Sequence, residues 1–190
     1  MDALEKAFTG HGFAFSYFET KEQAVAYLAE QCAGKRVGFG GSMTLDELGA
    51  FDALSQTADV HWHWKGEKPC VDAEVFLTSA NGLSTTGEVV NLDGASNRVA
   101  ASLYGAKECF VVCGVNKLAP SLEAAVARTR NIAAPRNAQR LNRKTPCAVT
   151  GKCHDCRSPE RICSSLVIHL APPLSFQRYE IVLIGEVLGY

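Results

Sequence analysis

The chain carries almost no net charge, because its 190 residues include 19 lysines and arginines against 20 aspartates and glutamates, a formal charge of −1 at pH 7. Acidic and basic residues are interspersed along the sequence. Tight binding to nucleic acid or to an anionic membrane surface depends on a concentrated positive field. The charge balance therefore indicates neither of these partners.

No strongly apolar segment opens the sequence. The first twelve residues, MDALEKAFTGHG, already contain charged side chains, so we expect neither a secretory signal nor a membrane anchor there and expect a cytoplasmic protein. Linkers rich in proline and serine, repeats and low-complexity tracts are also missing from the sequence. With 47% apolar residues the chain can bury a core without disulfide bonds. We expect a single domain over residues 1–190.

Strand and helix patterns alternate along the sequence. Thr20 and Gln23 form a capping box that predicts a helix ending near Gly34, and Thr44 with Glu47 predicts another through about residue 54. Two later helices are expected, over residues 95–104 and 122–133. Strands are expected at residues 37–39, 60–64, 73–80, 108–114, 164–171 and 178–186, with a hairpin over 83–94. The alternation favours an α/β fold with a mostly parallel sheet and helices on both faces.

Four of the eight cysteines crowd into one loop-like stretch, PCAVTGKCHDCRSPERIC, which is inserted before the last two predicted strands. In a reducing compartment thiols do not persist as disulfides, so clustered cysteines are better candidates for metal ligands. The spacing Cys147-x5-Cys153-x2-Cys156-x6-Cys163 is short enough to wrap one centre. We therefore predict a metal-binding loop over residues 146–164.

The identity of the metal stays open between two alternatives. Structural zinc more often uses two separated pairs of closely spaced ligands, so a single thiol-rich loop favours an iron-sulfur centre, a 4Fe-4S cluster. Zinc is the alternative, and four reduced thiols without metal are the third reading. His154, between two of these cysteines, is interpreted as a polar loop residue rather than a ligand.

A glycine turn, VGFGGSMT, follows the first predicted buried strand. Glycines there allow a tight turn that points backbone amides outward, and the next helix adds positive dipole character, a combination that suits phosphate or carboxylate. The candidate ligand-binding residues are Gly40, Gly41, Ser42 and Thr44. A tight strand-to-helix connection with ordinary capping is the competing interpretation.

Polar residues also gather around the predicted hairpin, between residues 79 and 98. They follow strand ends, which is where open parallel sheets bind ligands. The candidates for ligand binding are Asn81, Asp93, Asn97 and Arg98. Turn geometry alone can also explain Asn91, Asp93 and Gly94.

Other cysteines and histidines receive plainer interpretations. Cys109 and Cys113 lie four residues apart on a buried strand, so they are expected to be small core residues. On the strand pattern VHWHW, the two histidines share one face and the two tryptophans the other. No role is assigned to Cys32, Cys70, His61 or His63.

Several long motifs, in order along the chain, carry a family resemblance. The sequence resembles the LUD-domain, or lactate-utilisation, family and within it a short cysteine-containing branch. The motifs are VGFGGSMTLDELG, TSAN, TGEVVNLDGASNRVAASLYG, VVCGVNKL, ARTRNIAAPRNAQR and KTPCAVTGKCHDCRSPERIC.

The resemblance implies a fold similar to ribose-5-phosphate isomerase and the CoA transferases. It also implies a redox or accessory component of lactate or other organic-acid utilisation, working with iron-sulfur or electron-transfer partner proteins. A glutamate near a strand end can act as nucleophile or base in that fold group, which makes Glu88 the candidate catalytic residue. The alternative is a non-redox isomerase-like or CoA-transferase-like enzyme, or a binding protein for a phosphorylated or carboxylated small molecule, with structural zinc or no metal.

Overall fold

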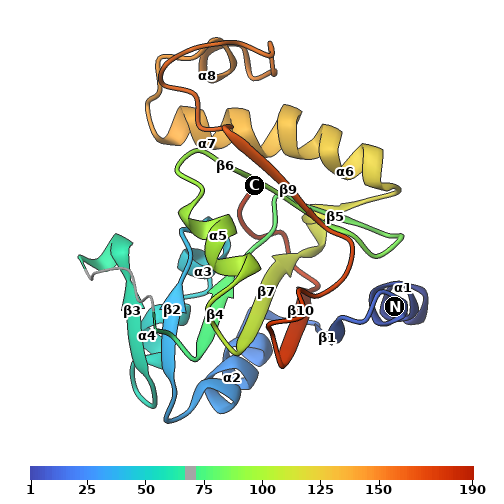
Figure 1. The fold of residues 1–190 in the computed structure, drawn as a ribbon, viewed down its shortest axis with the longest axis vertical. Coiled ribbons are helices and arrows are strands. Elements are labelled where there is room, and N and C mark those ends of the chain that lie inside the picture. Colours follow the sequence, from blue (N-terminus) through green and yellow to red (C-terminus); the bar gives the residue numbers. More distant parts are fainter. Residues whose placement is uncertain (67–71) are drawn as a thin grey trace.

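A computed structural model describes residues 1–66 and 72–190 of the chain (Figure 1). A six-stranded sheet forms its centre, in the order β1-β10-β7-β4-β2-β3, and every neighbouring pair is parallel. The strands are β1 Ala14–Phe18, β2 Arg36–Phe39, β3 Asp59–Trp62, β4 Val75–Thr78, β7 Glu108–Gly114 and β10 Arg178–Ile184. This confirms the predicted α/β fold with a parallel sheet flanked by helices.

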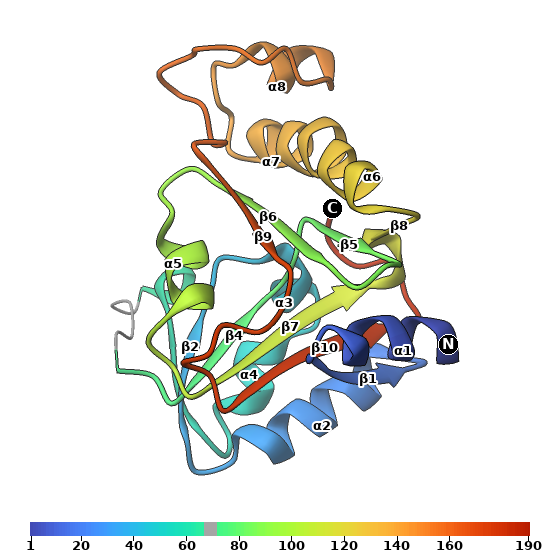
Figure 2. The ribbon, with the colours of Figure 1, turned by 45° about the vertical axis from the view of Figure 1, so that its right-hand side comes forward.

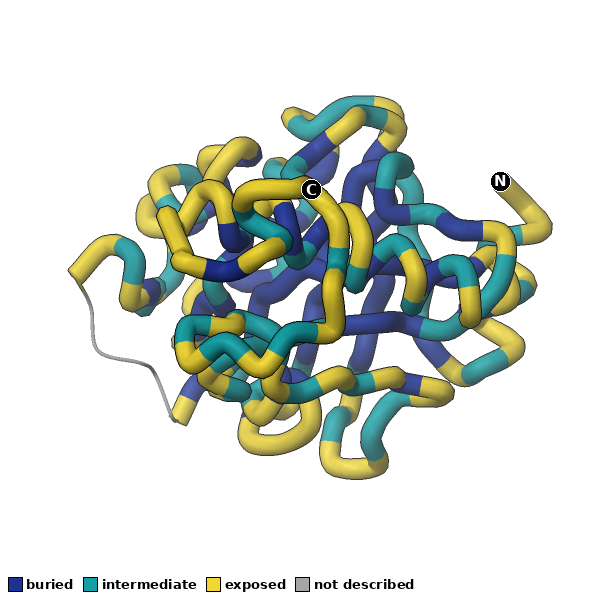
Figure 3. The backbone as a smooth tube through the Cα atoms, turned by 90° about the horizontal axis from the view of Figure 1, so that it is seen from above, coloured by how far each residue is buried: buried dark blue, intermediate teal, exposed yellow. Residues whose placement is uncertain are grey.

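Three helices cover one face of this main sheet: α2 Lys21–Cys32, α3 Met43–Glu47 and α4 Ala50–Leu54. Alternate residues of each central strand point to this face, as Phe110 and Val112 of β7 do, and they form one buried cluster with Leu28 and Leu54. The central strands are buried on both faces, which is why they read as nearly continuous apolar runs in the sequence (Figure 3).

A second, four-stranded sheet lies on the other face, in the order β8-β5-β6-β9. Its strands are β5 Gly82–Ser84, β6 Val89–Asp93, β8 Leu118–Ala119 and β9 Ser165–His169. The predicted hairpin is present as β5 and β6, and β9 pairs antiparallel with β6. Leu83 and Val89 join the second buried cluster, together with Val111 and Ile181 of the main sheet. Helices α1 Asp2–Gly10 and α5 Asn97–Leu103 also lie on this side.

A long helical segment forms the outermost layer over the second sheet (Figure 2). It consists of α6 Leu122–Arg128, the π turn η3 Thr129–Ala133 and α7 Ala134–Arg140, which run on without a break. Beyond it lies the cysteine loop, which contains the short helix α8 Pro146–Thr150. The remaining elements are the 3-10 turns η1 His63–Lys65 and η2 Val115–Lys117.

The two predicted capping boxes had different outcomes. In α2, the Thr20 hydroxyl accepts from the Gln23 backbone amide at 3.4 Å, and the Gln23 side chain accepts from the Thr20 backbone amide, as predicted. The second box was wrong, because Ser42 rather than Thr44 caps α3, accepting from the Leu45 amide at 3.2 Å. The helix then breaks at Gly49, whose φ of 64° is left-handed, and α4 begins after it.

The strand expected over residues 60–64 is shorter than predicted. β3 ends at Trp62, and the next three residues form η1. The strand geometry was therefore wrongly predicted beyond Trp62, but the two tryptophans do lie together, with ring centroids 5.2 Å apart. Cys109 and Cys113 are both fully buried on β7, which confirms their interpretation as core residues.

None of the helices in the two described ranges combines the length and hydrophobicity needed to cross a membrane.

Gly82 tests the contact between the second sheet and the outer helix. A Cβ on Gly82 would lie 2.8 Å from the Ala125 carbonyl oxygen and 3.0 Å from the Thr129 hydroxyl. We expect Gly82→Ala to lower the free energy of unfolding by about 1–3 kcal/mol in urea denaturation. The control is Gly10→Ala, where nothing lies within 4 Å of the new methyl group. Equal stability of the two variants would contradict this packing.

Candidate functional site

A cavity of about 660 Å³ opens over the carboxyl ends of β2, β4 and β7, which are adjacent strands of the main sheet. This is the edge at which open parallel sheets bind ligands. We call it the larger cavity. Its other walls come from the β6–α5 turn, the end of α7 and the cysteine loop. The predicted residues that line it are Gly41, Ser42, Thr44, Asn81, Asp93, Asn97 and Arg98.

The floor of the larger cavity contains buried polar side chains from three loops. The Ser79 hydroxyl donates to the Thr44 hydroxyl at 3.3 Å, and Ser42 is 7% exposed. Lys117 is 3% exposed and its ammonium donates to the main-chain oxygen of Tyr190. Burial lowers the pKa of Lys117 to about 8, below its ordinary value of 10.5. A buried lysine of this kind can bind an anion or exchange a proton near neutral pH.

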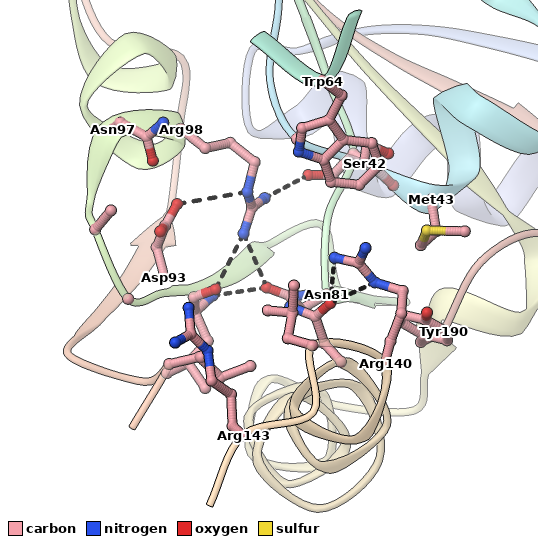
Figure 4. A pocket seen from close by; sticks show the side chains of 18 of the residues that line it. Ser42, Met43, Trp64, Asn81, Asp93, Asn97, Arg98, Arg140, Arg143 and Tyr190 are labelled. Carbon is pink, nitrogen blue, oxygen red and sulfur yellow. Dashed lines mark hydrogen bonds and ion pairs between the residues drawn. The ribbon is translucent and has the colours of Figure 1, made fainter. Parts of the chain in front are cut away.

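Arg98 connects the larger cavity to both sheets (Figure 4). Its guanidinium donates to the Ser79 carbonyl at 3.0 Å, the Leu92 carbonyl at 3.0 Å and the Asn81 side chain at 3.2 Å. It also donates to the Asn91 side chain at 2.6 Å, and its Nε lies 3.5 Å from a carboxylate oxygen of Asp93. With its donors occupied by the protein, Arg98 positions the cavity walls rather than offering free hydrogen bonds.

The two glycines of the predicted turn have different surroundings. Gly41 lines the larger cavity, where a Cβ would lie 3.1 Å from the Trp64 ring. Gly40 does not line it, and its amide donates to the Leu77 carbonyl at 2.8 Å. A Cβ on Gly40 would lie 2.9 Å from the Arg98 side chain. Gly40 therefore makes room for Arg98, while Gly41 allows close approach of the backbone to the cavity.

Sequence reasoning missed several residues of this site. Lys117 follows the predicted strand β7, and a charged residue just after a buried parallel strand was the available signal. Arg140 lies on the last turn of α7, with its guanidinium 4.9 Å from the Trp64 ring centre. Contacts of this kind join segments far apart in the chain, and no local pattern predicts them.

A second cavity, of about 280 Å³, lies within the cysteine loop, and we call it the cysteine cavity. All four predicted metal ligands line it: Cys147, Cys153, Cys156 and Cys163. Each is partly buried. Within residues 1–66 and 72–190, no three His, Cys, Asp or Glu side chains are grouped as ligands of one metal ion.

Hydrogen-bond donors approach two of these sulfurs. An Nη2 donor of Arg130 lies 3.7 Å from the Cys153 sulfur, and the Asp155 amide donates to the same sulfur at 3.5 Å. The Thr145 hydroxyl lies 3.3 Å from the Cys147 sulfur. Four thiols, one of them beside two N–H donors, are a donor set that fits zinc or an iron-sulfur cluster.

The two cavities are neighbours, because Leu92 and Arg161 line both. The end of β6 holds the cysteine loop in place: the Ser164 amide donates to the Asp93 carbonyl at 2.9 Å. Close packing adds to this contact, since a Cβ on Gly94 would lie 3.0 Å from the Ile162 backbone. Residues 159–162 of the loop also form part of the wall of the larger cavity.

Glu88 lies away from both cavities. It sits in the β5–β6 turn, where its carboxylate accepts from the Thr86 hydroxyl at 2.6 Å. The preceding residue, Gly87, packs against Ala7 of α1. Burial raises the pKa of Glu88, but hydrogen bonds from Thr86 and Ser84 outweigh it and leave the pKa lowered.

The residues without an assigned role are scattered. Cys32 is in the core under α2, and burial raises the pKa of its thiol to about 12. His61 lies 3.0 Å from the carboxylate of Asp59, and His63 is at the rim of the larger cavity. Cys70 lies outside the described residues.

The sequence profile described as the LUD domain matches residues 1–174 of the chain. No curated protein gives a significant match. Among solved structures, the chain is similar to the crystal structure of a DUF162 family protein from Deinococcus radiodurans, with a TM-score of 0.58 and 14% sequence identity. The alignment covers 97% of this chain and 95% of that chain. At this identity, the likeness shows a shared fold.

Arg98→Lys tests how the cavity walls are held. Lysine keeps the charge but cannot reach the acceptors that the planar guanidinium joins. We expect the free energy of unfolding to fall by about 2–3 kcal/mol, measured by urea denaturation. The exposed residue Arg136, on α7, provides the control Arg136→Lys, for which we expect a change close to zero.

Lys117→Met tests the buried ammonium. Because the pKa of Lys117 is lower in the folded protein than its ordinary value, the unfolded chain binds more protons between pH 8 and 10.5. The folded state of the wild type is therefore penalised fully below pH 8, and the penalty disappears as pH rises to 10.5. We expect Lys117→Met to gain stability relative to the wild type at pH 7 and to lose that gain by about pH 10. A difference that does not change with pH would contradict the assignment.

Proposed function

Because the chain belongs to the LUD-domain family, we propose that it is a redox component of organic-acid utilisation. It binds a small anionic ligand in the larger cavity and a 4Fe-4S cluster in the cysteine cavity. The observation that carries the proposal is that four cysteines line one cavity, which shares Leu92 and Arg161 with a cavity rich in cationic side chains.

The cysteine side of the proposal rests on the donor set and on space. A zinc ion draws four sulfurs to about 2.3 Å from one point, whereas each cysteine of a cluster binds its own iron atom. The cavity that the four thiols line together with other residues, about 280 Å³, has room for a group larger than one ion. When bound, the cluster supplies single-electron transfer, for which an electron-transfer protein is the expected partner. Arg130 and the Asp155 amide stabilise negative charge on the Cys153 sulfur.

The ligand side of the proposal rests on the floor of the larger cavity. Ser42, Thr44 and Ser79 supply hydroxyl groups, and Lys117 supplies a buried ammonium group. Together they suit a carboxylate, and the family resemblance suggests lactate or a related 2-hydroxy acid. With its lowered pKa, Lys117 can hold or release a proton at Nζ beside the ligand.

The second candidate function is a non-redox enzyme of the isomerase or CoA-transferase type, or a binding protein for a phosphorylated or carboxylated molecule. The observation that favours it is that the larger cavity carries its own acid–base group, Lys117, and needs no metal for proton transfer. In that case the cysteine loop binds structural zinc or no metal.

Metal content distinguishes the two candidates. Protein purified without oxygen from iron-supplied cells should be brown and contain about four iron atoms per chain. Cys153→Ser should lose the iron, because that sulfur lines the cysteine cavity, while Cys109→Ser should keep it, because Cys109 is buried on β7.

Iron analysis and visible absorption of the three proteins provide the measurement. Colourless anaerobic protein with one bound zinc and no iron would overturn the redox proposal and favour the second candidate. Equal loss of iron in both variants would overturn the assignment of the ligands.

A further inference from the structure

The larger cavity contains more positive than negative charge. Its charged lining residues are Arg98, Lys117, Arg140, Arg143 and Arg161 against Asp93 and Glu160. Asp93 already faces Arg98, and the Glu160 carboxylate accepts from the Lys144 amide at 2.9 Å. Arg140, Arg143 and Arg161 therefore have no carboxylate of the cavity wall to neutralise them, whereas the Lys117 ammonium donates to the main-chain oxygen of Tyr190.

Three of these cations form no ion pair in the part of the chain that the structure describes. Arg140 donates to the Asn137 side chain at 2.9 and 3.0 Å and lies over the Trp64 ring. Arg161 donates to the Cys163 carbonyl at 2.9 Å, and the nearby Cys163, Cys156 and Asp155 side chains raise its pKa. The exposed Arg143 side chain makes no hydrogen bond or ion pair there. Unlike Arg98, these guanidinium groups have donors to offer a ligand.

The cations come from two different layers of the fold. Lys117 follows the carboxyl end of β7 and lines the same cavity as Ser42 and Thr44. Arg140 and Arg143 come from the end of α7 and the turn after it (Figure 4), and Arg161 comes from the cysteine loop. A ligand that neutralises both groups must therefore span the cavity from the main sheet to the outer layer.

The size of the cavity agrees with such a ligand. At about 660 Å³ it falls within the range typical of drug-sized ligands, and a three-carbon monocarboxylate fills only a small part of it. The part of the cavity that a monocarboxylate leaves empty is not suited to an aromatic base stacked on Trp64. The Trp64 ring is stacked on Trp62 with an angle of 18° between the ring planes, and the Arg140 guanidinium lies over the Trp64 ring as well.

We propose that the ligand of the larger cavity is an elongated molecule with two anionic groups, each a carboxylate or a phosphate. One group binds at Lys117 and the floor hydroxyls, and the other binds Arg140, Arg143 and Arg161. This inference rests on the proposed ligand-binding function and specifies its ligand class. A ligand with two anionic groups is a different class from a monocarboxylate such as lactate.

Three matched probes test the inference by isothermal titration calorimetry on the full chain at constant ionic strength. 3-Phosphoglycerate carries a carboxylate and a phosphate, glycerate carries only the carboxylate, and glycerol 3-phosphate carries only the phosphate. We expect 3-phosphoglycerate to bind at least about tenfold more tightly than either single-headed probe, since a second charged contact adds about 1.4 kcal/mol or more.

Variants then locate the second anionic group. Arg143→Gln should weaken binding of 3-phosphoglycerate about tenfold or more and leave glycerate binding unchanged. Arg161→Gln should do the same, and Lys117→Met should weaken all three probes. Arg136→Gln, an exposed arginine of α7 that does not line the cavity, is the matched control and should change nothing.

Equal affinities for the three probes, or no binding of any of them, would overturn the inference. So would equal effects of Arg143→Gln and Arg136→Gln. Iron analysis of the same preparations keeps the two proposals distinguishable. Iron-free protein that prefers 3-phosphoglycerate contradicts only the redox function, while iron-loaded protein without that preference contradicts only the two-headed ligand.

Discussion

The Arg98 guanidinium is the interaction on which the candidate site depends. It joins the Ser79 carbonyl, after the end of β4, to Leu92 and Asp93 at the end of β6. The main sheet and the second sheet are thereby held at a fixed separation, with the larger cavity between the strand ends. Because the side chain of Arg98 is only 12% exposed, losing one of these partners leaves a buried charge poorly compensated. Gly40 helps to hold Arg98 in this position, because any side chain at that residue would clash with the Arg98 side chain.

The outer helix places three arginines at three different points. Arg128 donates to the Asn116 carbonyl at 2.9 Å, near the end of β7, and Arg130 reaches Asp155 of the cysteine loop at 2.7 Å. Arg140 reaches the larger cavity. The π turn η3 lies between the first and last of these residues, and the wider turn changes the faces on which later side chains emerge. One continuous helix therefore contacts the sheet edge, the cysteine loop and the wall of the larger cavity.

The sequence predicted local features better than it predicted contacts between distant segments. The glycine turn, the Asn81 and Asp93 loops and the four-cysteine spacing were visible because each is a local pattern, and the structure gathers nearly all of these residues around two cavities. The second sheet was not predicted, because its β8 and β9 are recruited from distant parts of the chain. Ligand binding was predicted for Arg98 because it follows a strand end, while its hydrogen bonds to the Ser79 and Leu92 carbonyls come from tertiary structure that no local pattern shows.

The cysteine loop forms part of the wall of the larger cavity and also lines the cysteine cavity. Its residues 159–162 form one wall of the larger cavity, and its backbone at Ile162 packs on Gly94 of the β6–α5 turn. Arg161 lines both cavities, so the same side chain belongs to the surroundings of the cysteines and to the wall of the larger cavity. A group bound by the four thiols would therefore also constrain Arg161. Because coupling between two binding sites is reciprocal, an anion bound at Arg161 would favour the same arrangement of the loop.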